Sequence, residues 1–306
     1  MKASIIVSNL EPQGVLLPCI SVLCNQGFAG KYEVIFPYKG NVSREEQTIL
    51  RHYEKQYPHF RVVDVPGNRS ISLNNAVRQS EGDLLLFMES HCVTGRDWLS
   101  RYFGLFKEKK FQAAFMDIRC VPSDCWVSNA VINQRSSVIN KLLKSGRYDA
   151  YFDLHSSAVT RDCFEEFGGF REELPSLAEF EFGARLHHKG IKIFKVQDYS
   201  IWHFNNRTMA SYEKIIKGQG RDRTRILFKN GEEFFKSYFS NELFIRLLPL
   251  FRTFRLPLVA LMQSLIYGNA AGFKLCEMLN LNEASGYFFK KFAVNCHRYG
   301  MLRELK

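Results

Sequence analysis

Residues 82–91 read Gly-Asp-Leu-Leu-Leu-Phe-Met-Glu-Ser-His, and this stretch decides the fold. Five consecutive apolar residues, Leu84 to Met88, follow the turn-forming pair at its start. A short apolar run bounded by turn residues is typical of a strand that is buried on both faces of a parallel sheet. Glu89 and His91 follow this strand directly. They therefore stand at the carboxyl end of a strand, where ligands bind in open α/β sheets.

The residues before this strand alternate between strand and helix patterns. Apolar runs predict strands over residues 4–7, 32–36 and 60–65. The spacing of apolar residues predicts helices over residues 15–24, 43–56 and 72–79. Ser43 and Glu46 form the Ser-x-x-Glu pattern of a capping box at the start of the second of these helices. We therefore expect an α/β fold with a mainly parallel sheet and helices on both faces.

The composition is that of a folded protein. The chain has 306 residues, of which 46% are hydrophobic and 24% charged, enough for one large core with an appendage. The eight cysteines lack C-x-x-C spacing, and the first residues are strand-like rather than a long apolar leader. We expect reduced thiols and a cytoplasmic protein. The sequence carries no P-loop and no dinucleotide-binding fingerprint.

The positive charge is concentrated in the last third of the chain. Residues 207–306 carry 17 Lys and Arg against 8 Asp and Glu, a net charge of +9 out of +11 for the whole chain. Apolar runs over 243–251 and 256–267 interrupt these charges, a pattern that favours an anionic membrane surface over nucleic acid. Pro249 and Pro257 leave each run too short to span a bilayer. A helical core with basic outer faces explains the pattern equally well.

Glu89 and His91 are a candidate metal-binding pair. A carboxylate and an imidazole two residues apart at a strand end can point toward one ion, and oxygen and nitrogen ligands suit a divalent metal such as manganese. The structural alternative is that Glu89 caps the next helix and that His91 packs in a loop.

Several segments, in one order along the chain, resemble the GT-A glycosyltransferases of family 2. Residues 82–91 are similar to the family's G-D-y-l-l-f-l-D-x-D segment. The other matching segments are Ser-Leu-Asn-Asn-Ala at 72–76, Phe-Glu-Glu-Phe-Gly-Gly-Phe-Arg-Glu at 164–172, Leu-Ala-Glu-Phe-Glu-Phe-Gly-Ala-Arg-Leu at 177–186 and Ile-Trp-His at 201–203. The resemblance implies a GT-A catalytic domain over residues 1–225, followed by a helical, basic extension over 226–306. From the basic and apolar pattern of this extension we expect peripheral attachment to the cytoplasmic face of a membrane.

The resemblance also implies roles for the acidic and histidine residues. Glu89 and His91 take the two metal-binding positions of the Asp-x-Asp motif, and His203 is the third ligand of a Mn²⁺ or Mg²⁺ ion. Glu179 takes the position of the catalytic base, which removes a proton from the acceptor hydroxyl opposite the leaving group and so inverts the anomeric centre. Two alternatives remain open: His203 packs in the core beside Trp202, and Glu179 is an exposed residue at a helix start.

Substrate contacts follow from the same resemblance. The implied donor-binding residues are Ser8, Tyr38, Lys39, Asn74, Glu89, Lys217 and Arg221, and the implied acceptor-binding residues are Trp126 and Glu181. Family members carry Asp-Asp-Gly-Ser after the second strand, whereas residues 36–41 here read Phe-Pro-Tyr-Lys-Gly-Asn, and Asn74 replaces the usual Arg. The resemblance implies a UDP-sugar, and these departures leave GDP and dTDP as alternative nucleotides.

The function that the resemblance implies is metal-dependent, inverting transfer of a sugar from a nucleotide sugar to a hydroxyl of a glycan, a lipid-linked or a peptide acceptor. We expect non-processive transfer, because the Q-x-x-R-W motif of the multispan synthases is missing. The alternative is a degenerate, non-catalytic GT-A-like binding or partner protein, which the changed 36–41 segment and the Glu at position 89 favour. The presence of Glu89, His91, Glu179 and His203 together favours the enzyme.

Overall fold

The computed structural model describes residues 1–8, 15–38, 43–109, 111–123, 125, 127–133, 147–204, 208–239, 251, 253–278 and 282–305. The chain divides into two compact units. The sheet unit comprises residues 1–122, 143–173 and 178–206, and the helical unit comprises 123–142, 174–177 and 207–306. The functional boundary that we predict at residue 225 stays a prediction. The structural division falls at residue 206, because one long helix, α8 (Met209–Phe239), runs through residue 225.

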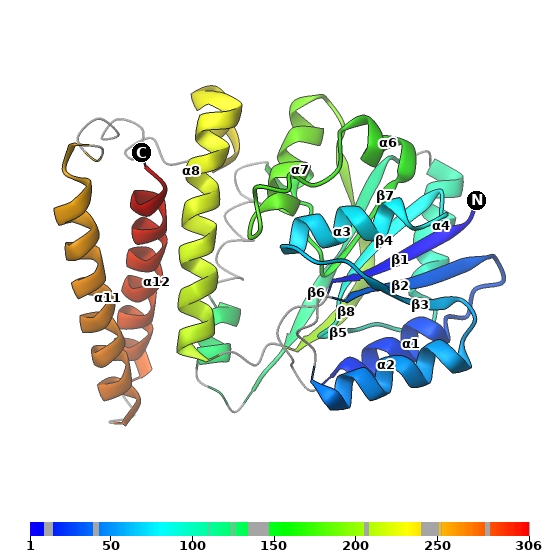
Figure 1. Ribbon diagram of the computed structural model, residues 1–306, viewed down its shortest axis with the longest axis horizontal. Helices are drawn as coiled ribbons and strands as arrows, with labels where there is room; N and C mark the ends of the chain where they lie inside the picture. The colour runs from blue at the N-terminus through cyan, green and yellow to red at the C-terminus, as the bar shows by residue number, and fades with distance from the viewer. Residues whose placement is uncertain are drawn as a thin grey trace. The chain divides into compact units, whose positions relative to one another are not determined.

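The sheet unit is built on an eight-stranded mixed sheet with the strand order β3-β2-β1-β4-β7-β6-β8-β5 (Figure 1). The strands are β1 (Ala3–Ser8), β2 (Tyr32–Tyr38), β3 (Phe60–Asp64), β4 (Leu84–Glu89), β5 (Cys92–Val93), β6 (Ala113–Val121), β7 (Ser156–Thr160) and β8 (Ile193–Phe204). The four strands β3, β2, β1 and β4 are parallel, as the sequence predicts. β7 runs antiparallel to β4, so the start of β7 lies beside the end of β4.

Helices connect these strands. They are α1 (Leu16–Cys24), α2 (Arg44–Gln56), α3 (Arg69–Arg78), α4 (Trp98–Lys109), the 3-10 turn η1 (Arg147–Ala150), α6 (Arg161–Glu166) and α7 (Ala178–His188). The capping box of Ser43 and Glu46 is confirmed in α2. The predicted start of α3 at residue 72 is wrong. The helix begins at Arg69, because the side chain of Asn68 accepts hydrogen bonds from the backbone N–H groups of Ser70 and Ile71.

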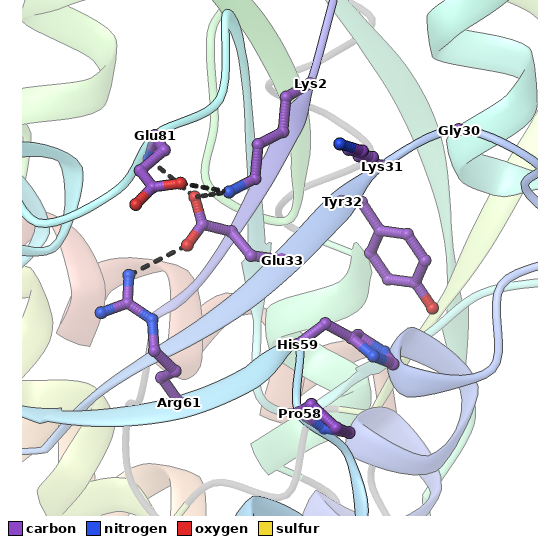
Figure 2. A pocket seen from close by; sticks show the side chains of 9 residues that line it. All are labelled: Lys2, Gly30, Lys31, Tyr32, Glu33, Pro58, His59, Arg61 and Glu81. Atoms are coloured by element: carbon purple, nitrogen blue, oxygen red, sulfur yellow. Dashed lines mark hydrogen bonds and ion pairs between the residues drawn. The ribbon is translucent and has the colours of Figure 1, made fainter.

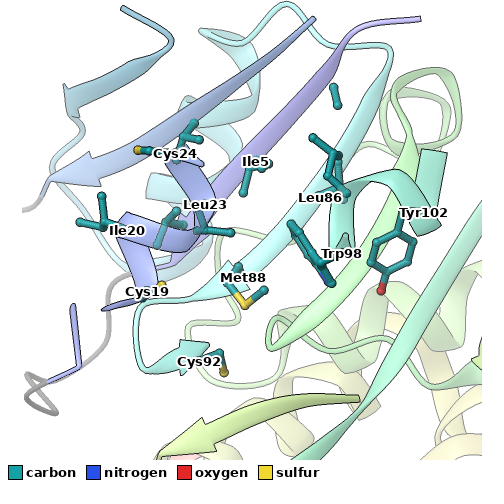
Figure 3. Packing of buried hydrophobic residues seen from close by; sticks show 14 of the residues in the cluster. Ile5, Cys19, Ile20, Leu23, Cys24, Leu86, Met88, Cys92, Trp98 and Tyr102 are labelled. Atoms are coloured by element: carbon teal, nitrogen blue, oxygen red, sulfur yellow. The ribbon is translucent and has the colours of Figure 1, made fainter. Parts of the chain in front are cut away.

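Both faces of β4 are buried, which explains its continuous apolar sequence. On one face, Leu86 and Met88 pack in a cluster that includes Ile20 of α1 and Trp98 of α4, and Figure 3 shows these side chains together. On the other face, Phe87 makes edge-on ring contacts with Phe152 and Phe170. Side chains alternate along a strand, so Glu89 points to the same face as Phe87. The predicted α/β fold class, with helices on both faces of the sheet and further helices after it, is confirmed.

The helical unit consists mainly of α8, α11 (Arg255–Met278) and α12 (Asn282–Glu304). Its core includes Tyr212 of α8, Ile266 and Phe273 of α11, and Phe289 and Phe292 of α12. α8 is interrupted at Gly231, whose φ of 84° lies in the left-handed region that glycine adopts readily.

A cavity of about 570 Å³ lies at the amino ends of β1, β2 and β3. Four of its charged side chains, Lys2, Glu33, Arg61 and Glu81, pair with one another. Glu33 lies 2.9 Å from Arg61, and Lys2 lies 2.6 Å from Glu81 (Figure 2). This edge is opposite to the carboxyl end of β4. The cavity is therefore lined by a network of ion pairs and lies at the opposite edge of the sheet from the predicted metal residues.

Candidate active site

Four potential metal ligands gather at the carboxyl end of β4. They are Glu89, His91, His155 and His203, and one ligand atom from each lies within 4.8 Å of the others. Glu89 ends β4 and His91 lies in the turn that follows it. His155 directly precedes β7, whose residue Ser156 pairs with Met88. His203 lies on β8 opposite Cys92 of β5. Sheet topology therefore brings together four residues from three distant parts of the chain.

The ligand atoms converge on one point. Nε2 of His91 lies 2.9 Å from Nε2 of His203, and Oε2 of Glu89 lies 3.1 Å from Nε2 of His91 and 2.9 Å from Nε2 of His155. Glu89, His91 and His203 are each at most 3% exposed. Neighbouring ligands held at about 2.1 Å from one ion lie roughly 3 Å apart when the angle between them is near 90°. One carboxylate and three imidazoles with this spacing fit a divalent transition metal such as manganese.

Further side chains orient the histidines. Nδ1 of His155 lies 3.3 Å from Oδ2 of Asp153, and the same oxygen accepts a 2.6 Å hydrogen bond from the hydroxyl of Tyr151. Sγ of Cys120 lies 3.5 Å from Nδ1 of His203. A carboxylate on the second ring nitrogen fixes the orientation of a ligating imidazole and increases its basicity. Asp153 therefore holds His155 with its Nε2 toward Glu89.

The charge state of Glu89 follows from its neighbours. Burial disfavours the carboxylate, but the imidazoles of His155 and His91 outweigh this effect and hold the pKa of Glu89 well below its usual value. Glu89 is the last residue of its strand, so the alternative of Glu89 as a helix cap does not hold.

Glu179 lies in the first turn of α7 and is 5% exposed, so the alternative of an exposed residue at a helix start is wrong. One guanidinium nitrogen of Arg69 donates to both carboxylate oxygens of Glu179 at 2.6 Å. A second nitrogen of Arg69 lies 3.3 Å from Oε1 of Glu89. Burial raises the pKa of Glu179, although the charge of Arg69 opposes this rise. Arg69 thus links the predicted base to the candidate metal ligand.

Glu181, a predicted acceptor contact, is fully buried between two guanidinium groups. Its carboxylate lies 2.9 Å from Arg171 and 2.9 Å from Arg185. Arg185 also donates to the carbonyls of Phe167 and Gly169. These contacts tie α7 to the turn after α6, and acceptor binding by Glu181 stays a prediction.

Three predicted donor contacts, Asn74, Ser8 and Tyr38, lie on three different elements of the sheet unit, α3, β1 and β2. Asn74 bonds through both ends of its amide to the backbone of Phe170, 2.7 Å to its carbonyl and 3.0 Å from its N–H. Ser8 ends β1 beside Glu89, and its hydroxyl is buried with no hydrogen-bond partner among the described residues. Tyr38 ends β2 and its hydroxyl accepts a bond from Gln47.

The remaining predicted contacts belong to the helical unit or to residues that the structure does not describe. Lys217 and Arg221 are on α8 in the helical unit, where Lys217 pairs with Glu213 and its ammonium lies 4.3 Å from the ring centre of Tyr299. Lys39 and Trp126 lie outside the described residues.

His155 and Arg69 belong to the site but are not among the residues that the sequence predicts. Each has a local signal. His155 follows Asp153-Leu154 directly before a strand, and Arg69 follows Asn68, the N-cap of α3. Each signal predicts where a strand or helix begins. Neither predicts which other strand or helix lies beside it in the fold.

Comparison with known proteins gives a family match. Residues 4–166 match the sequence model of glycosyl transferase family 2. An N-acetylglucosaminyltransferase of Rhizobium meliloti (strain 1021) is 24% identical over 131 residues, 42% of this chain and 30% of the relative. A poly(ribitol-phosphate) beta-glucosyltransferase of Bacillus spizizenii is 24% identical over 113 residues, 36% of this chain and 18% of the relative. The chain spans less than a third of the length of either relative.

Solved structures share the fold. The mannosyltransferase PcManGT from Pyrobaculum calidifontis, in complex with GDP-Man and Mn²⁺, has a TM-score of 0.60 and 14% identity, covering 95% of this chain and 86% of that one. TarS 1-349 of S. aureus, in complex with UDP-GlcNAc, has a TM-score of 0.56 and 18% identity, covering 98% and 90%. These likenesses confirm the predicted GT-A fold, and fold alone does not fix a substrate.

Proposed function

This chain belongs to glycosyl transferase family 2, and from that premise we propose that it transfers a sugar from a nucleotide-sugar donor to an acceptor hydroxyl, with inversion and with the help of a divalent ion. The observation that carries this proposal is the buried group of Glu89, His91, His155 and His203, joined through Arg69 to Glu179. A group of potential metal ligands next to a carboxylate suits direct displacement at an anomeric carbon. A bound ion would stabilise the leaving group, and the carboxylate would act as the base.

The residues that would hold the ion are Glu89, His91 and His203, with His155 as a fourth candidate that the sequence alone does not suggest. When bound, a divalent ion neutralises the charge that develops on the diphosphate leaving group. Mn²⁺ in the PcManGT complex makes manganese the first ion to test.

Glu179 is the proposed base. Its carboxylate would accept the proton of the attacking hydroxyl on the face of the sugar opposite the diphosphate, which gives inversion. Burial raises the pKa of Glu179, and the charge of Arg69 opposes this rise and so favours the ionised form that a base needs.

The donor is proposed to be a UDP-sugar. The UDP-GlcNAc complex of TarS 1-349 and the N-acetylglucosaminyltransferase of Rhizobium meliloti make UDP-GlcNAc the first candidate, and the GDP-Man complex of PcManGT makes GDP-mannose the second. We propose non-processive transfer to a glycan, lipid-linked or peptide hydroxyl. Cytoplasmic location is consistent with eight cysteines that are all free thiols.

Donor hydrolysis tests this proposal. The purified protein is incubated with UDP-GlcNAc, UDP-glucose and GDP-mannose, with Mn²⁺ or with chelator, and the released nucleoside diphosphate is measured. We expect release from one donor, loss of release with chelator, and a fall of at least about 100-fold for Glu89→Gln.

Glu33→Gln is the matched control. Glu33 is also a buried, ion-paired glutamate of the same sheet, but it lies at the amino end of β2. Its variant should release the diphosphate at the wild-type rate, with an unchanged circular dichroism spectrum for both variants. Absence of release from every donor, together with absence of nucleotide binding by calorimetry, would overturn the enzyme and favour the non-catalytic alternative.

A further inference from the structure

Most of the outward face of α11 is apolar. Its exposed large side chains are Leu256, Leu261, Leu265, Tyr267, Leu275 and Met278, with exposed fractions from 40% to 80%. The sequence from Leu256 to Phe273 contains no charged residue. A surface helix normally carries charged and polar residues on the face that meets water. Over this stretch α11 has no charged face.

The inward face of α11 is apolar as well. Ile266, Phe273 and Cys276 are buried, and the first two belong to the core of the helical unit. A helix that is apolar on all sides is found where all sides are covered, in a protein core or in contact with lipid. Only 11% of its most apolar window is buried within this chain. Something beyond the residues that the structure describes is therefore needed to cover the outward face.

Basic side chains surround this apolar face. α12 lies beside α11 (Figure 1), with Arg255 bonded to the carbonyl of Arg303 at one end and Gly272 against Phe288 near the other. The exposed basic residues of the pair are Lys274, Lys290, Lys291, Arg298 and Arg303. Residues 255–305 contain only three acidic residues, of which Glu304 is paired with Arg225. The charge complements an anionic surface.

The helix pair is not suited to cross a bilayer. By length and composition α11 is long and apolar enough to span one, so the prediction that the run after Pro257 is too short is wrong. However, α12 runs antiparallel along it and exposes Lys290, Lys291 and Arg298 in its central turns. Moving these charges into hydrocarbon would be strongly unfavourable. An orientation in the membrane plane leaves them at the headgroups.

We infer that the outward face of α11 inserts into the interfacial layer of a membrane that contains anionic lipid, with the exposed basic residues of α11 and α12 contacting the headgroups. The inference does not depend on the proposed transferase activity, because lipid binding by this surface requires neither donor nor metal.

Vesicle sedimentation with the full chain tests this surface, without donor or metal. Vesicles of phosphatidylcholine alone are compared with vesicles of phosphatidylcholine mixed equally with phosphatidylglycerol. We expect binding to the mixed vesicles that weakens as salt is added. Leu261→Glu should lower the partition coefficient about tenfold. Lys290→Gln with Lys291→Gln should weaken binding to the mixed vesicles alone.

Leu17→Glu is the matched control, because Leu17 on α1 is 48% exposed and Leu261 is 51% exposed. It should bind vesicles like the wild type. Equal loss in both variants, or absence of binding to either vesicle, would overturn the inference. So would sedimentation velocity that shows a dimer dissociated by Leu261→Glu while vesicle binding persists, since a second copy would then cover α11.

Discussion

At the scale of single residues, Arg69 is the link on which the site depends. It is 13% exposed and contacts both Glu179 and Glu89. Two buried carboxylates near each other repel, and each favours the protonated form of the other unless a cation lies between them. The fixed charge of Arg69 lies against both carboxyl groups and favours the ionised form of Glu179, although burial still raises the pKa of Glu179.

We therefore predict that Arg69→Ala lowers kcat about 100-fold, because the base loses its position and its charge partner. Arg69→Lys should restore only part of the activity, since lysine keeps the charge but has a single nitrogen, whereas Arg69 contacts Glu179 and Glu89 through two. Steady-state kinetics on the active donor measure both variants. Arg78→Ala is the control, because Arg78 lies on the same helix in an exposed pair with Glu172 and should leave kcat unchanged. Equal kcat for Arg69→Ala and Arg78→Ala would contradict the role of Arg69.

At the scale of elements, α7 must lie close to the segment before β7 for Glu179 to reach Arg69. Gly183 permits this approach, because a Cβ there would lie 2.4 Å from the carbonyl of Ala150 and 2.8 Å from Cβ of Phe152. Glu181, Arg171 and Arg185 then hold the helix in place by buried ion pairs. The position of the base thus depends on the packing of a whole helix.

Gly183→Ala should accordingly destabilise the protein by about 1–3 kcal/mol, since the added methyl overlaps backbone that cannot move aside. Activity should fall as well, because Glu179 moves with α7. Gly104→Ala is a matched control within α4, where an added methyl meets no atom within 4 Å. It should stabilise the protein by about 0.5–1 kcal/mol. Urea unfolding measures both, and a neutral Gly183→Ala would show that the close approach is not needed.

At the scale of the whole molecule, the helical unit contains a group that makes stability depend on pH. Nε2 of His297 on α12 is buried with no hydrogen-bond partner among the described residues. Burial, followed by the charges of Arg223 and Arg298, holds the pKa of His297 well below its usual value of 6.5. In acid the unfolded chain therefore takes up a proton at His297 that the folded chain does not.

The sign follows from linkage. Above pH 6.5, His297 contributes a constant amount to the free energy of unfolding. Below pH 6.5, the free energy of unfolding should fall by up to about 1.4 kcal/mol per pH unit. Urea unfolding of wild type and His297→Gln between pH 8 and 5 measures this, and the variant should lose less stability in acid. His52→Gln, at an exposed position on α2, should follow the wild type. Parallel curves for wild type and His297→Gln would exclude His297 as the cause.

The sequence by itself determined the buried strand Leu84–Met88, the candidate metal residues Glu89 and His91 directly after it, and the capping box of α2. Each of these is local, because strand burial and helix capping depend on residues a few positions apart. Only the tertiary structure added His155 and Arg69 to the site and paired Glu181 with two arginines. Periodicity reports which face a side chain takes, but not which strands become neighbours, and it was the antiparallel pairing of β7 with β4 that brought His155 beside Glu89.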